Sequence, residues 1–263
     1  MIPNLMSMKT PVNRQVKLLQ KLIRPSQRKK SGMFIAEGQR VVEQILISKK
    51  LHCEFVLVSE KLWDEWNHKI ADVEVLAGEP ELLEQISSTV QSQHIFAICH
   101  EPDQYDFQEI MQQTGLIVAS DALQDPGNIG TIYRSAVWFG ATGWLHGKGS
   151  VDLFQPKVVR STAGATGLLP FVSGPLPAQL ETLAEKGWNI NILHLSDDAI
   201  SLPEWRPSER EIIVIANEGS GPDETLVRNY PSLMIPSYSS KQVESLNASV
   251  SAGIVMHAWA ASR

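Results

Sequence analysis

Apolar runs alternate with amphipathic segments through the first hundred residues of the chain. Residues 12–24 repeat apolar side chains at helical spacing, and Pro25 is expected to end this helix. The basic stretch 26–32 (SQRKKSG) is then expected to be a loop. Strands are predicted at residues 34–38, 53–60, 73–78 and 93–100, with helices between them. This alternation predicts a small α/β domain of three layers.

The alternation restarts after a polar segment. Residues 101–114 (EPDQYDFQEIMQQT) have little apolar repeat, and we expect a linker within them at 104–114. Strands that are apolar throughout are typical of a parallel sheet covered by helices on both faces. The chain is therefore predicted to hold a first domain at 1–103 and a second, parallel-sheet α/β domain at 115–263. Strands of the second domain are expected at 116–121, 143–147, 189–195, 211–221 and 232–237, and its last helix from about Glu244 to Ala261.

The composition is that of an ordinary globular protein. The chain has 263 residues, 43% of them hydrophobic and 20% charged, and no apolar run reaches the ~18 residues of a membrane span. The first residues (MIPNLMSMKTPVNR) contain no apolar secretory segment, so we expect a cytoplasmic protein with no membrane partner. Cys53 and Cys99 lie in separate apolar runs, without further ligands at metal-binding spacing. We therefore expect buried thiols in a reducing compartment and no metal site.

Charge is distributed unevenly along the chain. The formal net charge is −6, yet residues 1–50 carry 11 Lys and Arg against only Glu37 and Glu43, a balance of +9. The remaining 213 residues carry a balance of −15. This asymmetry has two interpretations: the basic end faces a polyanion, or it is the solvated surface of a helix. Charge alone does not separate them.

The first of three loops with unusual polar residues is QDPGNIGTIYR, which follows the strand at 116–121. Asn128 is explained as the N-cap of the next helix. Helix capping does not explain Arg134. The pattern predicts that this residue is buried beside apolar neighbours, and a buried arginine requires a partner. An arginine that projects from the first turns of a helix at a strand end can instead bind an anion.

The other two loops follow later strands. In IANEGSGPDE, Gly219 and Gly221 allow a ligand to approach the backbone closely, although a plain loop explains them equally. The chain contains neither G-x-G-x-x-G nor a Walker A sequence, which counts against a Rossmann dinucleotide enzyme and an ordinary Rossmann methyltransferase. In the third loop, Ser245 or Asn247 can cap the last helix. That helix is rich in small residues, which favours close packing, including packing across a dimer interface.

Taken together, the three loops resemble the motifs of the SpoU/TrmH group of the SPOUT superfamily, which are RNA 2′-O-ribose methyltransferases. The resemblance extends over residues 116–262, and residues 30–46 resemble the opening of a substrate-binding domain of ribosomal-protein-like fold. Two departures are Ala216 in place of a glycine, and Ser237–Ser240 in place of a methionine and a glycine. The matching segments are Asn128–Gly130, Arg134 and Phe139–Gly140 in the first motif, Ala216–Gly221 in the second, and Ile235–Pro236 with Ser245–Ser249 in the third.

The resemblance implies an α/β fold with a deep trefoil knot that binds S-adenosylmethionine. It implies methyl transfer to a ribose 2′-hydroxyl, a group that RNA has and DNA lacks. Because a guanidinium stays protonated, we expect Arg134 to bind a phosphate or the developing alkoxide rather than to act as the base. The implied catalytic residues are Arg134, Asn128, Glu218, Ser245 and Asn247. The implied cofactor-binding residues are Ala216, Asn217, Glu218, Gly219, Ile235, Leu246 and Asn247.

The resemblance also implies specific roles for individual site residues. Asn128 is expected to hold Arg134, Glu218 to orient Arg134 or the cofactor, and Ser245 and Asn247 to fix the loop and the substrate. The first domain is expected to bind RNA phosphates, and its resemblance favours ribosomal RNA over transfer RNA. The chain is expected to be a homodimer through the second domain. The expected RNA-binding residues are Arg14, Lys17, Lys21, Arg24, Arg28, Lys29 and Lys30.

Two other functions stay open at this point. A non-catalytic RNA-binding protein on the same fold need not bind the cofactor. An oxidoreductase that binds a nucleotide or a flavin is a further alternative, and the missing glycine fingerprint counts against it.

Overall fold

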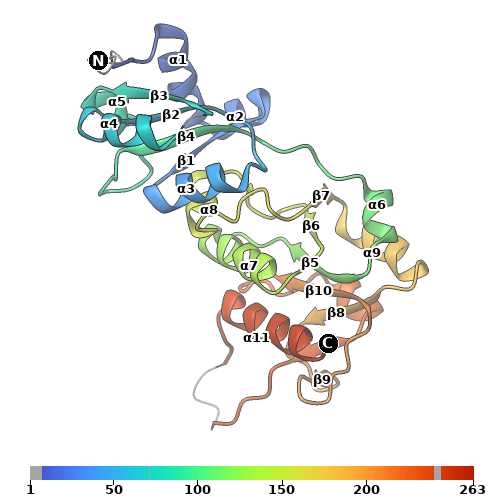
Figure 1. The fold of residues 1–263 in the computed structure, drawn as a ribbon. Coiled ribbons are helices and arrows are strands. Elements are labelled where there is room, and N and C mark those ends of the chain that lie inside the picture. The colour runs from blue at the N-terminus through green and yellow to red at the C-terminus, as the bar shows by residue number, and fades with distance from the viewer. Residues whose placement is uncertain (1–7, 71, 240–243) are drawn as a thin grey trace. The chain divides into compact units, whose positions relative to one another are not determined.

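The computed structural model describes residues 8–70, 72–239 and 244–263 (Figure 1). The chain divides into two compact units. The first contains Met1–Pro102 and Phe154–Gly167, and the second contains Asp103–Leu153 and Leu168–Arg263. No helix among the described residues is both long enough and apolar enough to cross a membrane.

The first unit is built on a four-stranded sheet. The strand order is β1-β4-β2-β3, and β4 runs antiparallel to both of its neighbours while β2 and β3 are parallel. These strands are β1 (Met33–Glu37), β2 (Cys53–Ser59), β3 (Glu74–Gly78) and β4 (Ile95–His100). The helices of this unit are α1 (Asn13–Leu22), α2 (Pro25–Ser31), α3 (Gln39–Ser48), α4 (Glu60–Lys69), α5 (Pro80–Ile86) and α8 (Pro156–Ser161).

Apolar side chains cover this sheet on both faces. Leu19 of α1 belongs to one buried cluster with Ile35 of β1 and with residues of α5. Phe34, the neighbour of Ile35, points to the opposite face, where its ring lies 5.3 Å from that of Phe154 just before α8. Helices therefore pack on both faces, as the three-layer prediction required.

The predicted basic loop is a helix. Pro25 begins α2 instead of only ending α1, because proline lacks an N–H and has a fixed φ, both of which suit the first position of a helix. Gly32 ends α2 with φ of +61°, and its N–H donates to the carbonyl of Arg28 at 2.8 Å.

The second unit contains a seven-stranded sheet in which every neighbouring pair is parallel. This confirms the predicted parallel-sheet α/β fold. The strand order is β7-β6-β5-β10-β8-β11-β9. The strands are β5 (Gly115–Asp121), β6 (Gly143–Gly147), β7 (Phe171–Gly174), β8 (Asn189–Leu193), β9 (Ile200–Ser201), β10 (Arg210–Ala216) and β11 (Ser232–Met234).

Two strands were not expected from the sequence, β7 and the two-residue β9, because both are too short to show an apolar period. The helices of this unit are α6 (Phe107–Gln112), α7 (Pro126–Trp138), α9 (Leu176–Glu185), α10 (Glu224–Asn229) and α11 (Ala248–Ala261).

The polar segment predicted as a linker at 104–114 contains α6. Its N-cap is Asp106, whose side chain accepts from the N–H of Gln108 at 2.9 Å. Ile110 and Met111 are buried in the core of the second unit. A helix of six residues, with apolar side chains only at Phe107, Ile110 and Met111, is too short to show a sustained repeat, which is why the pattern suggested a linker. Residues 154–167, predicted within the second domain, pack with the first unit instead.

The register of the large sheet brings two of the three loops together. Asp121 at the end of β5 is paired with Ala216 at the end of β10. The loops after these two central strands therefore leave the sheet side by side, at the edge where parallel α/β sheets bind their ligands.

Candidate active site

Helix α7 begins at Pro126, and its N-cap is Asp125. The Asp125 carboxylate accepts from the N–H of Asn128 at 2.7 Å, so the prediction that Asn128 caps the helix is wrong. Aspartate is favoured at the N-cap and proline at the first position of a helix, and the sequence contains them in this order. Asn128 lies one turn inside the helix with only 9% of its surface exposed, and its side chain is available for contacts with distant segments.

Three segments that are far apart in the sequence meet at the carboxylate of Glu218. Its Oε1 accepts from Nδ2 of Asn128 at 2.5 Å and from the N–H of Ala248 at 3.0 Å. Nδ2 of Asn247 donates to Oδ1 of Asn128 at 3.0 Å and lies 3.4 Å from the same Glu218 oxygen. The structure thus brings together one residue from each of the three loops selected from the sequence.

Asn247 also caps the last helix. Its Oδ1 accepts from the N–H groups of Ser249 and Val250 at 2.9 and 3.3 Å, while its amide donates to the Glu218 cluster. Helix α11 begins at Ala248 and not near Glu244, because the backbone of Asn247 is not helical. Asn247 therefore caps the helix through Oδ1, as predicted, and contacts the Glu218 cluster through Nδ2.

The turn at residues 217–221 is fixed to the loop after β5. Nδ2 of Asn217 donates to the carbonyl of Ala122 at 2.9 Å, and Oδ1 accepts from the N–H groups of Gly219 and Ser220 at 2.8 and 3.1 Å. Gly221 has φ of +71°, which favours glycine, and its N–H closes the turn on the carbonyl of Asn217 at 3.0 Å. The result is a rigid turn that presents exposed residues 218–220 at the sheet edge.

Asp121 adds a second connection between these loops. Its Oδ2 accepts from the N–H of Asp223, at the start of α10, at 2.9 Å. Burial raises the pKa of Asp121, the nearby Asp223 carboxylate raises it further, and the hydrogen bond from Asp223 opposes both. Sequence reasoning missed Asp121, although its position at the end of a central strand was a usable signal.

Of the other predicted cofactor residues, Ala216 ends β10, Ile235 follows β11 and Leu246 lies just before α11. Ala216 is buried, Ile235 is half-buried and Leu246 is 49% exposed. The departure at Ser237–Ser240 is only partly visible, because Ser240 lies outside the described residues. A surface hollow of about 410 Å³ borders the turn; it is lined by His194, Ser220, Gly221, Pro222, Glu224, Val227 and Arg228.

Arg134 is exposed, which corrects the prediction that it is buried. Helix α7 turns Ile132, Tyr133 and Ala136 into the core and leaves Arg134 on the outer side, next to Trp138, which is 83% exposed. Among the described residues it has no hydrogen-bond or ion-pair partner, and Asn128 bonds to Glu218 and Asn247 instead. Its guanidinium is therefore available to an anion from outside the chain.

Ser245, like Arg134, is a predicted catalytic residue that the structure does not join to the cluster around Glu218. It is exposed, and within the described part of the chain its hydroxyl makes no hydrogen bond.

The seven residues predicted to bind RNA fall into two groups. Arg28 is buried at 2% exposure, and its Nη1 donates to the carbonyls of Leu22 and Ile23, both at 3.2 Å. It satisfies carbonyls at the end of α1 and is not available to RNA, which corrects that prediction. The remaining six cations are exposed: Arg14, Lys17, Lys21, Arg24, Lys29 and Lys30.

Comparison with known proteins agrees with this architecture. The model of the SpoU rRNA Methylase family matches residues 115–257, and that of the MRM3-like substrate binding domain matches residues 13–97. The 23S rRNA (guanosine(2553)-2′-O)-methyltransferase RlmP of Bacillus subtilis is 29% identical over 246 residues, which are 93% of this chain and 95% of that protein.

Solved structures share the whole fold. A putative RNA methyltransferase of the TrmH family from Porphyromonas gingivalis has a TM-score of 0.80 and 27% identity, and the match covers 95% of this chain and 98% of that one. An AdoMet-bound rRNA methyltransferase from Sinorhizobium meliloti has the same TM-score of 0.80 at 22% identity, with 95% of each chain covered. The arrangement of the three loops, the family match over more than half of the residues and these structures lead to one conclusion: the chain belongs to the SpoU rRNA methylase family.

Proposed function

We propose that the protein transfers a methyl group from S-adenosylmethionine to a ribose 2′-hydroxyl in ribosomal RNA. The observation that carries this proposal is the meeting of Asn128, Glu218 and Asn247, one residue from each motif, at one carboxylate. Only Oε1 of Glu218 takes part. Among the described residues, none donates to Oε2, and the side chain is exposed at the sheet edge. A carboxylate with one oxygen held by the protein and one open is suited to a ligand.

The cofactor site is the turn at 217–221 together with the segments around Ile235 and Leu246. The two apolar side chains offer partly exposed surface to an adenine ring, and the turn offers backbone held in one conformation by Asn217. Ala216 is buried, so its methyl group leaves the exposed surface of the turn unchanged. When bound, S-adenosylmethionine supplies a methyl group that is already activated on a sulfonium, and the protein's task is to position the acceptor.

Arg134 is the residue that we assign to the RNA. Its guanidinium is exposed, carries a positive charge and has no partner among the described residues. It can bind the phosphate next to the target ribose and stabilise the alkoxide that forms when the 2′-hydroxyl loses its proton. Glu218, Asn128 and Asn247 position the turn and the start of α11, and Ser245 contacts the substrate.

A homodimer through α7 and α11 fits the exposed apolar surface of the second unit. Val250 and Ile254 are 50% and 38% exposed on the outer side of α11, and Trp138 of α7 is 83% exposed. Helix α11 packs on α7 with its other side, so it is apolar on both sides, as expected for a helix buried from two directions. Arg134 lies one turn from Trp138, so the same surface borders the proposed RNA contact.

The dimer has its own test. Ile254→Glu is expected to give monomers in sedimentation analysis, because it places a charge in the contact. Ile47→Glu, at a 71% exposed position of the first unit, is the matched control and should leave the assembly unchanged. If the wild type and Ile254→Glu both sediment as monomers, the homodimer is wrong.

The six exposed cations of α1 and α2 are the proposed RNA surface of the first unit. Contacts with phosphates are strong at low salt and carry little sequence information, so the shape of the RNA must select the site. The first unit matches a substrate-binding domain, and the relative RlmP is named for 23S rRNA, which supports ribosomal over transfer RNA. We also propose a cytoplasmic location.

The test combines binding and turnover. Calorimetry with S-adenosylmethionine should show one site per chain, and label from the methyl group should appear in rRNA as a 2′-O-methyl nucleotide. Label in transfer RNA alone would favour the alternative substrate. RNA binding without any affinity for the cofactor would favour the non-catalytic alternative and overturn the proposal.

A further inference from the structure

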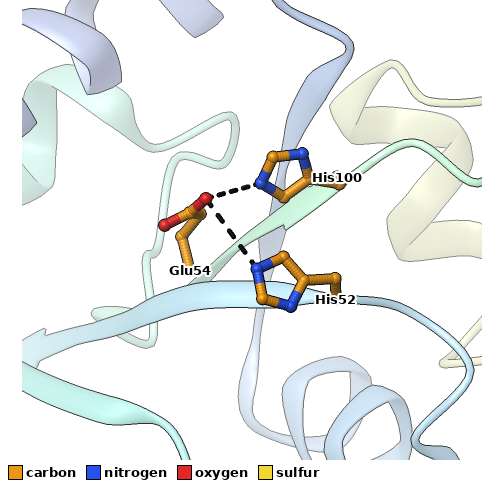
Figure 2. Close-up of side chains that lie close together, drawn as sticks. All are labelled: His52, Glu54 and His100. Carbon is orange, nitrogen blue, oxygen red and sulfur yellow. Dashed lines mark hydrogen bonds and ion pairs between the residues drawn. The ribbon is translucent and has the colours of Figure 1, made fainter.

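A cluster of two histidines and a glutamate lies on the first unit, outside the proposed active site (Figure 2). His52 directly precedes β2, Glu54 lies within β2, and His100 ends β4. The N–H of His100 donates to the carbonyl of His52 at 2.9 Å, so these two residues lie opposite each other on antiparallel segments. Since side chains alternate along a strand, His52 and Glu54 share one face of the sheet with His100.

The three side chains point at one another, as Figure 2 shows. Oε1 of Glu54 lies 2.6 Å from Nε2 of His100 and 3.9 Å from Nε2 of His52. The two rings have centroids 4.9 Å apart, and the three candidate ligand atoms all lie within 4.8 Å of one another. The separation to His52 is too long for a hydrogen bond, so the carboxylate–imidazole hydrogen bond involves His100, while His52 has a ring contact with His100 and a long ion-pair separation to Glu54.

Two imidazole nitrogens and one carboxylate oxygen form a ligand set that Zn²⁺ uses in proteins, with bonds of about 2.0–2.2 Å. The side chains are 73%, 44% and 39% exposed for His52, Glu54 and His100, so each can adjust its rotamer by the small movement that coordination requires. Their exposure also gives the ion access from solvent and leaves the fourth position to water.

We propose that His52, Glu54 and His100 bind one Zn²⁺ ion, which joins the start of β2 to the end of β4. This site was not predicted from the sequence, because His100 is far from the other two residues along the chain. Only the pairing of β2 with β4 brings them together.

The opposite face of the same strand pair holds a competing set of ligands. Sγ of Cys53 and Sγ of Cys99 lie 3.0 Å apart, and both cysteines are free thiols. Thiolates bind zinc tightly, so the experiment must separate the two faces.

The experiment uses the full chain without a histidine tag. Calorimetric titration with Zn²⁺ should give one site per chain, and a saturating ion should raise the melting temperature because it binds only the folded strands. His52→Ala and His100→Ala should each weaken binding more than about tenfold, since even residues that only support a metal ligand contribute 10–100-fold. The double variant Cys53→Ala with Cys99→Ala should keep the zinc affinity.

His94→Ala is the matched control. Nε2 of His94 lies 2.9 Å from Oε1 of Glu84, and among the described residues no third metal-binding side chain joins this pair. This variant should bind Zn²⁺ as the wild type does. The absorption of the Co²⁺-loaded wild type gives a second readout, because nitrogen and oxygen ligands produce no thiolate charge-transfer band.

Two results would overturn the proposal. One is a wild type without saturable zinc binding. The other is full zinc affinity in His52→Ala and His100→Ala together with a thiolate band in the cobalt spectrum, which would place the ion on the cysteines.

Discussion

Glu37 in the first unit and Glu218 in the second are both carboxylates that hold loops together, yet they differ in what they leave open. Glu37 ends β1 with 3% of its surface exposed, and both of its oxygens accept hydrogen bonds from Ser87, Ser88, Thr89 and Ser92. Glu218 is exposed, and in the part of the chain that the structure describes only its Oε1 accepts hydrogen bonds, from segments on either side of it in the sequence.

The difference separates a carboxylate that holds a loop in place from one that we propose is available to a ligand. Among the described residues, the hydrogen-bond donors to Glu37 come from residues 87–92, and Nη1 of Arg160 adds an ion pair with Oε2 at 3.7 Å. The hydrogen bonds of this carboxylate therefore hold one loop at the end of β1. The donors to Glu218 come from Asn128, Asn247 and Ala248, so it joins two elements that are distant in the sequence. A buried carboxylate that accepts hydrogen bonds at both oxygens stabilises the fold. An exposed carboxylate that accepts them at one oxygen has the other available to a ligand.

The largest expected effect is that of Arg134→Ala. Turnover should fall by about 10²–10³-fold, because a charged group that stabilises the transition state is lost, while the affinity for S-adenosylmethionine stays within about twofold. Methyl transfer under single-turnover conditions and calorimetry measure the two quantities. Arg228→Ala, at another exposed arginine of the second unit in α10, is the control. Unchanged turnover in Arg134→Ala would end the assignment of this residue.

Glu218→Gln should lower turnover by about 10²-fold with a change in unfolding free energy below about 0.5 kcal/mol. The amide keeps the shape of the side chain and removes the charge that the open oxygen presents. Kinetics and urea unfolding of the same preparation give both values. A large loss of stability with normal turnover would make Glu218 a structural group like Glu37.

Glu37→Gln should have the opposite profile. It should lower the unfolding free energy by about 1–3 kcal/mol, because hydroxyl groups and an N–H lose a charged acceptor in a buried place. Turnover of the folded fraction should stay normal. Thermal and chemical unfolding test the first statement, and a stability equal to that of the wild type would contradict it.

The pH dependence sharpens the same contrast. Burial raises the pKa of Glu37, but the hydrogen bonds from Ser87, Ser88 and Thr89 together outweigh it, so the pKa lies below the ordinary value of 4.5. A depressed folded-state pKa stabilises the protein above the unfolded pKa, and this stability is lost as the pH falls through the folded value. Wild type should therefore lose stability below about pH 4.5 more steeply than Glu37→Gln does, in unfolding curves recorded across that range.

The smallest effect concerns two neighbouring basic positions. Lys29→Ala with Lys30→Ala should weaken RNA binding and reduce the slope of log affinity against log salt by about 1–2. Arg28→Ala should instead destabilise the first unit, because Arg28 is buried on the carbonyls of α1. Binding measured across a salt series distinguishes them. An Arg28→Ala protein of normal stability with a reduced salt slope would restore Arg28 to the RNA surface.

These residues show which features the sequence could reveal. Apolar periodicity located most helices and strands, and the three motifs selected loops that the structure brings together at Glu218. Periodicity could not give the rotation of α7, because this helix has apolar residues on both its core side and its exposed side, and Arg134 was therefore predicted to be buried. Arg28 shows the reverse error, since a cation in a basic run gives no sign that carbonyls at the end of α1 require a donor.

Contacts between distant strands were also beyond the sequence. The proximity of His52 to His100, and that of the two cysteines, depends on the register of β2 against β4. No local pattern specifies that register, so the metal ligands could not be recognised before the fold was known.

The central claim is that the three converging loops form a site of ribose methylation in ribosomal RNA. The most direct measurement maps 2′-O-methyl groups across the RNA of cells that lack this protein. The account predicts that one ribose methyl group disappears from ribosomal RNA, returns with the wild-type protein and does not return with Arg134→Ala. A methylation map identical to that of unmodified cells would contradict it.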